Sequence, residues 1–201
     1  MWYAAQTTCG KERTAIEECR NALPENLAAR IFVPRYQYMK KYQGQWHTEE
    51  AAAFPGYVFI ESEKPAELEE ALLRIPHTVT PVCIGGGFYP IRKEEEIFLR
   101  QMLDEQDCIR CSIGYLVDGQ LMVWQGPLKH AVERVRKIDR HKRLAEVEVR
   151  LFEESRQMKL GLEVKAKVSG AYEKGNTIHQ DVYIDNLLRK VDPKRLKELI
   201  F

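Results

Sequence analysis

Residues 54–60 read Phe-Pro-Gly-Tyr-Val-Phe-Ile, and this stretch decides the fold of the chain. Pro-Gly is a turn signal, and the run that follows it is β-branched and aromatic, with no charge before Glu61. An apolar run of this kind is typical of a buried central strand. It therefore predicts a strand against which the residues upstream and downstream pack.

The two rings that flank this turn, Phe54 and Tyr57, can serve in either of two ways. A large apolar ring at the entrance of a strand can fill the core, or it can stand out as an anchor for a partner. Filling the core is the commoner use, and the residues alone leave both uses open.

The periodicity on either side of the central strand predicts an α+β fold for the first half. Apolar residues recur every three or four positions in the predicted helices; the first ends before Pro24 and the second begins at Pro65. The stretch 40–47 is polar and basic, and we expect a hairpin tip with Tyr42 and Trp46 available for stacking. The order of elements predicts a mainly antiparallel sheet covered by helices, with strands at 2–7, 31–39, 54–60 and 78–84 and helices at 11–23, 65–75 and 93–103.

The second half changes to short apolar strands separated by turn signals, which is typical of a small β-barrel. Helical periodicity stops near 104–107, so we place the domain boundary there. The predicted domains are 1–106 and 107–167, followed by an extension at 168–201. The extension has a helical pattern, and we expect it to pack back on the barrel or on the first domain. The barrel strands are predicted at 121–124, 131–138, 145–152 and 158–164.

The formal net charge of +1 conceals an asymmetry between the two halves. Residues 1–107 hold 12 Lys and Arg against 17 Asp and Glu, whereas residues 108–201 hold 19 against 13. An acidic half joined to a basic one indicates two domains with different partners. The chain has no apolar run of about 18 residues and begins with a strand pattern, so we expect a cytoplasmic protein without a membrane partner.

The residues that could carry catalysis or bind metal form no recognisable motif. The five cysteines are scattered, and Cys108-Ile109-Arg110-Cys111 is followed by no second Cys or His pair that would complete a zinc site. Gly85-Gly86-Gly87 lacks the spacing and the following helix of a phosphate-binding loop. No local motif marks a nucleophile and its base. We therefore expect a binding protein that is not an enzyme and needs no metal or cofactor.

A dense basic cluster lies in the predicted barrel. Between Lys129 and Arg143 there are seven Lys and Arg against Glu133 and Asp139. A solvated charged face is one explanation, but the cluster falls at two loops of one small barrel, where the charges can converge and neutralise phosphates. We therefore predict RNA binding, with candidate residues Lys129, Arg134, Arg136, Lys137, Arg140, His141, Lys142 and Arg143.

Six motifs follow one another along residues 1–166: Trp2-Tyr3, Val33-Pro34, Phe54-Pro55-Gly56-Tyr57-Val58, Ile75-Pro76 to Ile84-Gly85-Gly86, Pro90-Ile91 and Gly126-Pro127-Leu128. With these motifs in this order, the chain resembles the NusG family of transcription elongation factors. The resemblance implies an N-terminal NGN-type α+β domain that holds RNA polymerase. It also implies a C-terminal barrel that carries a KOW motif.

The resemblance assigns partners to particular residues. In the family, an aromatic patch around the Phe-Pro-Gly-Tyr turn docks on the clamp helices of the largest polymerase subunit. Carried over to this chain, the patch is Phe54 and Tyr57, with Tyr3 and Phe32 as further candidates. The RNA that we predict for the barrel is a leader hairpin in the nascent transcript, because structured RNA is read through its backbone shape and its exposed loop bases. The non-template DNA strand is a further expected partner.

Within the family, Gly126-Pro127-Leu128 and the basic stretch 137–143 are most similar to the LoaP-type antiterminators. The resemblance therefore implies a transcription antitermination and elongation factor that promotes read-through of operons. Two alternatives stay open. One is a general elongation factor whose barrel contacts a termination factor or the ribosome. The other is a ribosome-associated RNA-binding protein that contains a KOW barrel.

Overall fold

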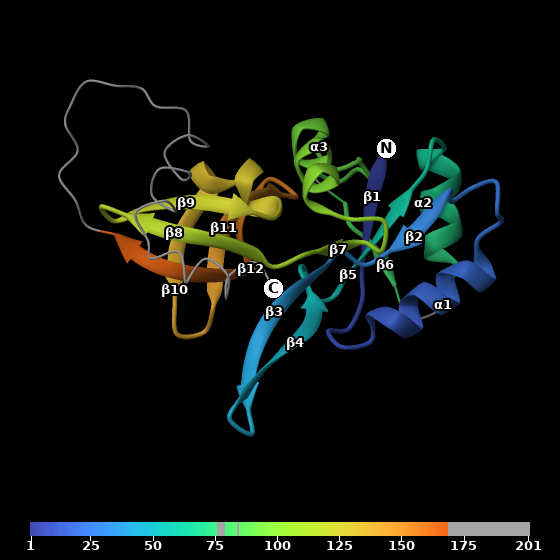
Figure 1. Cartoon of the computed structure of the whole chain (residues 1–201). Helices are drawn as coiled ribbons and strands as arrows, with labels where there is room; N and C mark the ends of the chain where they lie inside the picture. Colours follow the sequence, from blue (N-terminus) through green and yellow to red (C-terminus); the bar gives the residue numbers. More distant parts are fainter. Residues whose placement is uncertain (76–78, 84, 169–201) are drawn as a thin grey trace.

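The computed structural model of the chain describes residues 1–75, 79–83 and 85–168 (Figure 1). We call residues 1–106 the N-terminal module and residues 107–168 the C-terminal module. The N-terminal module consists of β1 (Trp2–Gln6), α1 (Glu12–Ala22), β2 (Arg30–Phe32), β3 (Arg35–Tyr42), β4 (Gln45–Ala52), β5 (Tyr57–Glu61), α2 (Pro65–Leu73), β6 (Thr80–Pro81) and α3 (Lys93–Met102). The C-terminal module consists of β7 (Cys108–Ile109), β8 (Ser112–Val117), β9 (Gln120–Gln125), the 3-10 turns η1 (Pro127–His130) and η2 (Val132–Arg134), β10 (Val135–Asp139), β11 (Leu144–Leu151) and β12 (Glu154–Val168).

Strand β5 lies inside the sheet of the N-terminal module, whose order is β2-β5-β1-β6. Both neighbours of β5 run antiparallel to it. Val58 and Ile60 point into a cluster with residues of α1 and α2, whereas Phe59 points into a second cluster on the opposite face. All three side chains are fully buried. The prediction of a buried central strand is confirmed, and burial on both faces explains why its sequence does not alternate with polar residues.

A hydrogen bond connects the Pro55-Gly56 turn to the start of α1. The N–H of Tyr57 donates to the carbonyl of Phe54 at 3.2 Å, which closes the turn, and Gly56 has a φ of +82°. The N–H of Gly56 donates to Oε1 of Glu12 at 2.7 Å, and its carbonyl accepts from Thr7 at 2.8 Å. A Cβ on residue 56 would lie 3.1 Å from the Thr7 carbonyl oxygen, so glycine is required here for both its φ and its size.

The predicted strand at 31–39 is wrong in one respect, because the structure divides it at Val33-Pro34. Strand β2 joins the central sheet, whereas β3 turns away and pairs with β4 and β7 in a separate sheet. The predicted hairpin tip at 40–47 is also largely strand, since β3 extends to Tyr42 and β4 begins at Gln45. We call the β3–β4 hairpin the arm; it projects away from the sheet (Figure 1). Its polar sequence reflects exposure of both strands near the tip.

The C-terminal module is a five-stranded sheet with the order β10-β11-β12-β8-β9. Strand β8 pairs with β12 in parallel, and the other pairs are antiparallel. Five strands that run alternately up and down require this arrangement when the first and last are neighbours. The sequence did not predict β8, and the predicted strand at 131–138 begins as a 3-10 turn. The predicted strand at 78–84 is reduced to β6 in the described residues, and the predicted helical extension lies outside them.

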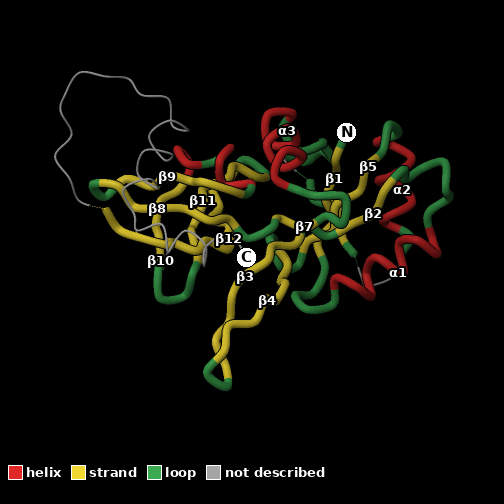
Figure 2. The backbone as a smooth tube through the Cα atoms, in the orientation of Figure 1, coloured by secondary structure: helices red, strands yellow, loops and turns green. Residues whose placement is uncertain are grey.

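One hydrophobic cluster spans the two modules. From the N-terminal module it contains side chains of β1, β2, β5 and α3, and from the C-terminal module it contains side chains of β9, η1, β11 and β12. Figure 2 shows α3 between the two groups of strands, and α3 contacts both η1 and β11. The central sheet therefore has α1 and α2 on one face, with α3 and the C-terminal module on the other.

The first prediction concerns the turn that fastens β5. We expect Gly56→Ala to lower the free energy of unfolding by about 2–3 kcal/mol, because a positive φ and a close carbonyl both oppose a Cβ. Gly119→Ala is the matched control, since Gly119 has a φ of +84° with open space around it, and it should cost about 1–2 kcal/mol. Urea unfolding measures both. Equal losses of unfolding free energy in the two variants would show that the contact between a Cβ at residue 56 and the Thr7 carbonyl oxygen has no effect.

The second prediction concerns Glu12. Burial acts to raise the pKa of this carboxyl, but hydrogen bonds from backbone N–H groups, that of Gly56 foremost, outweigh it and lower the pKa below its ordinary 4.5. A lowered folded-state pKa gives stability that is present above the unfolded pKa and is lost as the pH falls through the folded pKa.

Glu12→Gln should therefore cost about 1 kcal/mol at pH 7 and progressively less as the pH falls below 4.5. Unfolding in urea at several pH values measures this difference. Glu17→Gln, an exposed change on the same helix, is the control and should have little effect at any pH. A cost for Glu12→Gln that does not change with pH would contradict the proposed role of its charge.

Candidate interaction surfaces

Three of the four aromatic residues predicted to bind a partner lie on one face of the central sheet. Phe32 and Phe54 are 3% and 5% exposed, and each ring centre lies 5.8 Å from that of Phe59. Tyr57 is half-buried, and its ring stacks on Phe152 of the C-terminal module with centroids 5.1 Å apart. We call Phe32, Phe54 and Tyr57 the aromatic face. The C-terminal module covers this face, so the three rings do not stand out into solvent.

Tyr3 lies on the opposite side of the sheet. Its ring is fully buried and stacks on Phe88 at 4.9 Å. Successive side chains of a strand point to opposite faces, so Trp2, and not Tyr3, joins the cluster that contains the aromatic face. The structure therefore does not bring Tyr3 together with the other three rings. Strand alternation was the signal in the sequence that could have identified Trp2.

Two ion pairs join the modules beside the aromatic face. Arg92 donates to both carboxylate oxygens of Glu153, at 2.9 and 2.5 Å, and this pair is exposed. Arg134 donates to Glu95 of α3 at 3.0 and 3.1 Å, and its guanidinium carbon lies 4.1 Å from the centre of the Phe98 ring. Glu95 is buried, so Arg134 supplies the opposite charge that a buried carboxylate requires.

The arm contacts the C-terminal module as well. Gly161 of β12 lies so close to β3 that a Cβ there would collide with the carbonyl of Gln37 and with Sγ of Cys111. Nearer the tip of the arm, the guanidinium carbon of Arg143 lies 4.0 Å from the centre of the Trp46 ring. The modules are therefore in contact along the arm in addition to their contact around α3.

The structure divides the basic cluster into exposed residues and residues that contact the N-terminal module. Arg134 and Arg143 are half-buried and hold Glu95 and Trp46, respectively. Six members are exposed, and their ion pairs lie within the C-terminal module, at 2.5 Å for Arg136 with Glu148, 3.6 Å for Lys137 with Glu146 and 3.9 Å for Lys142 with Asp139. The exposed members are Lys129, Arg136, Lys137, Arg140, His141 and Lys142.

The β10–β11 turn has a defined shape. The backbone N–H of Lys142 donates to Oδ1 of Asp139 at 2.9 Å, and this hydrogen bond is the main reason why the pKa of Asp139 is lowered. Arg143 follows with a φ of +53°, which directs the chain back into β11. Nη1 of Arg143 also lies 3.2 Å from Glu163 of β12. The charges at the turn are therefore held in place by local hydrogen bonds and ion pairs.

The cysteines of the Cys-x-x-Cys sequence have the properties of buried thiols. Burial, followed by the charge of Glu50, raises the pKa of Cys108 to about 11, and burial also raises the pKa of Cys111. A raised pKa disfavours the thiolate that metal binding and nucleophilic attack both require. Within residues 1–75, 79–83 and 85–168, no three His, Cys, Asp or Glu side chains gather in a way that could hold a metal ion.

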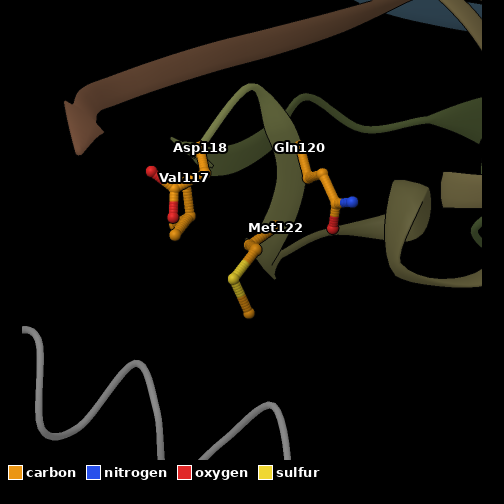
Figure 3. Close-up of a pocket in the computed structure, with 4 residues that line it drawn as sticks. All are labelled: Val117, Asp118, Gln120 and Met122. Atoms are coloured by element: carbon orange, nitrogen blue, oxygen red, sulfur yellow. The ribbon is translucent and has the colours of Figure 1, made fainter. Parts of the chain in front are cut away.

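A hollow of about 400 Å³ lies beside the β8–β9 turn. Figure 3 shows the described side chains that line it, Val117, Asp118, Gln120 and Met122. None of these belongs to the predicted sites, and they offer no pairing of a nucleophile with a base. Among the helices that the structure describes, none is both long enough and apolar enough to span a lipid bilayer.

Comparison with known proteins gives matches to a family model and to solved structures. The model of the family described as "Transcription termination factor nusG" matches residues 1–100. The solved structure described as "Domain interaction in Thermotoga maritima NusG" is 23% identical, with 81% of this chain and 93% of that chain covered and a TM-score of 0.50. An MjSpt4:Spt5 complex is 18% identical, with 80% and 93% covered and a TM-score of 0.32. Residues 1–100, just under half of the chain, therefore match the family described as "Transcription termination factor nusG".

Proposed function

We propose that this protein is a transcription elongation and antitermination factor that binds RNA polymerase through its N-terminal module and RNA through its C-terminal module. The observation that carries the proposal is the aromatic face, which lies in the part of the chain that matches the family and is apolar over a continuous area. The partner on the polymerase is the pair of clamp helices of its largest subunit. The target of the C-terminal module is a hairpin in the nascent transcript.

The polymerase part of the proposal depends on separation of the two modules. In the structure, Phe152 stacks on Tyr57, and residues of β11 and β12 share the cluster with Phe54. Separation would expose a continuous apolar area, which soluble proteins rarely leave without a partner. The pair of Arg92 with Glu153 is exposed to solvent, so it contributes little to closure. Polymerase would therefore select an open state that the free chain populates to a small extent.

The RNA part of the proposal rests on the six exposed members of the basic cluster. Three of them, Arg136, Lys137 and Lys142, form ion pairs with carboxylates near the surface, where an ion pair stabilises the fold only weakly. Phosphates of an RNA backbone can therefore replace these carboxylates at little cost. Arg136 and Arg140 also carry the planar guanidinium that binds phosphate or guanine through two hydrogen bonds. Contact with the transcript would keep the factor beside the elongating polymerase and so favour read-through.

The third prediction tests the aromatic face. Tyr57→Ala should weaken binding to core RNA polymerase about tenfold or more, because a ring at the centre of an interface carries much of its energy. Phe152→Ala should strengthen binding several-fold, because it uncovers Tyr57 and raises the fraction of open molecules. Equilibrium binding to purified core polymerase measures both changes.

Two further variants make this test specific. Glu153→Arg places like charges together at Arg92 without touching the core, and it should strengthen polymerase binding in the same direction as Phe152→Ala. Tyr89→Ala removes an exposed ring outside the cluster and should change nothing. If Tyr57→Ala binds polymerase normally while remaining folded, the aromatic face is not the contact. If Phe152→Ala and Glu153→Arg both weaken polymerase binding, contact between the modules does not oppose that binding.

The fourth prediction tests RNA binding. The full chain should bind an RNA stem-loop with an affinity that falls linearly on a log–log plot against salt concentration. The double variant Arg140→Ala with Lys142→Ala should reduce the slope by about two units, one for each lost phosphate contact. Arg13→Ala, an exposed change on α1, should leave the slope unchanged. Absence of salt-dependent affinity in the unmodified chain would overturn RNA binding and leave the polymerase proposal standing.

A further inference from the structure

The tip of the arm and the β10–β11 turn lie on the same side of the molecule. Both point away from the central sheet in the same direction (Figure 1). The contact between Trp46 and Arg143 shows that they meet, since Trp46 is two residues beyond the tip of the arm and Arg143 is the last residue of the turn. Two segments that are about a hundred residues apart in the sequence therefore form one edge of the protein.

Positive charge is concentrated along this edge. Residues 40–47 and 139–143 together contain five Lys and Arg and one acidic residue, Asp139, whereas the whole chain has a net charge of +1. Two of these cations lie over one ring, since Trp46 has Nζ of Lys41 at 6.0 Å and the guanidinium carbon of Arg143 at 4.0 Å from its centre. Lys41 and Arg143 are therefore at most 10 Å apart. The two cations are therefore close enough to contact phosphates of the same nucleic-acid strand.

The strand pairing of the arm fixes the positions of Lys41 and Trp46. Lys41 and Trp46 are directly opposite each other in the β3–β4 pairing, so the lysine and the ring share one face of the hairpin. On the other face, the rings of Tyr42 and His47 stack at 3.6 Å, and Tyr42 is exposed at the tip. Tyr42 lies on the face of the hairpin opposite Lys41 and Trp46. A strand whose phosphates contact Lys41 must therefore pass over the tip for one of its bases to stack on this ring, as bases of single-stranded nucleic acid stack on exposed rings.

Trp46 acts on the RNA through Arg143. A guanidinium that lies over an aromatic ring keeps its N–H donors at its edge, where they can reach a phosphate. Nη1 of Arg143 forms an ion pair with Glu163 at 3.2 Å, and this pair also orients the guanidinium. Trp46 thus orients the guanidinium of Arg143, and Lys41 and Arg143 carry the N–H donors that a phosphate would meet at this edge.

We infer that the RNA site is shared by the two modules, with the arm contributing Lys41, Trp46 and Tyr42 and the β10–β11 turn contributing Arg140, Lys142 and Arg143. This inference rests on the RNA binding proposed above and extends it to the N-terminal module. It applies to the closed chain, in which Arg143 contacts Trp46, and not to the open state that binds polymerase. It assigns single-stranded RNA, such as the loop of a hairpin, to the edge between them. The acidic N-terminal module would thus take part in RNA binding through the one basic stretch that it extends toward the turn.

The fifth prediction tests the arm with the full chain and an RNA stem-loop. Lys41→Ala should reduce the salt slope of binding by about one unit, whereas Lys64→Ala, an exposed lysine of the same module at the start of α2, should not. If Arg140→Ala reduces the slope and Lys41→Ala does not, the shared site is wrong and RNA binding by the C-terminal module stands. If the unmodified chain shows no salt-dependent binding, the proposed function fails and the shared site fails with it.

A double-mutant cycle tests the role of Trp46. Trp46→Ala and Arg143→Ala should each weaken binding, and the double variant should bind no more weakly than the weaker single variant, because the ring acts by holding the guanidinium. Trp46→Phe keeps a ring and should retain most of the affinity. Losses that add in full would overturn the positioning role. Equal affinity for a DNA stem-loop of the same sequence would overturn the assignment to RNA. Thermal unfolding of each variant confirms that it is folded.

Discussion

The structure depends on the burial of β5 from both sides. A strand with Val58 and Ile60 on one face and Phe59 on the other needs two apolar covers. Helices α1 and α2 form the first cover from within the N-terminal module. The second cover is only partly local, since α3 shares it with strands from the C-terminal module. The contact between the modules is thus a consequence of one apolar strand. Any protein that binds the aromatic face must replace the side chains of the C-terminal module that bury it.

The local parts of the fold could be predicted from the sequence because local patterns determine them. The periodicity of α1 and α3, the proline that begins α2 and the Pro-Gly turn before β5 all gave elements within a few residues of their observed ends. The break at Val33-Pro34 was not predicted, because both sides of it are β-prone and only the pairing partners differ. The outer part of the arm, residues 40–47, was predicted as a hairpin tip, since a polar, exposed pair of strands lacks the apolar alternation that identifies a strand.

The sites were harder to predict than the elements. The rings named for a partner came from the family resemblance, but alternation along β1 sends Tyr3 to the opposite face of the sheet and Trp2 into the cluster that contains the aromatic face. The basic cluster was treated as one surface, but two of its eight members contact the other module. Contacts such as Arg134 with Glu95 and Arg143 with Trp46 join residues that are far apart in the sequence, and no pattern along the chain encodes them.

The parallel pairing of β8 with β12 has a consequence for biosynthesis. Strand β8 can pair with β9 at once, but it cannot pair with β12 until that strand has left the ribosome, more than forty residues later. At about 5–20 residues per second, the emerging N-terminal module waits several seconds with one apolar side bare. During translation the newly made chain thus passes through an uncovered form before it closes, and chaperones or a nearby partner have their first opportunity to bind it then.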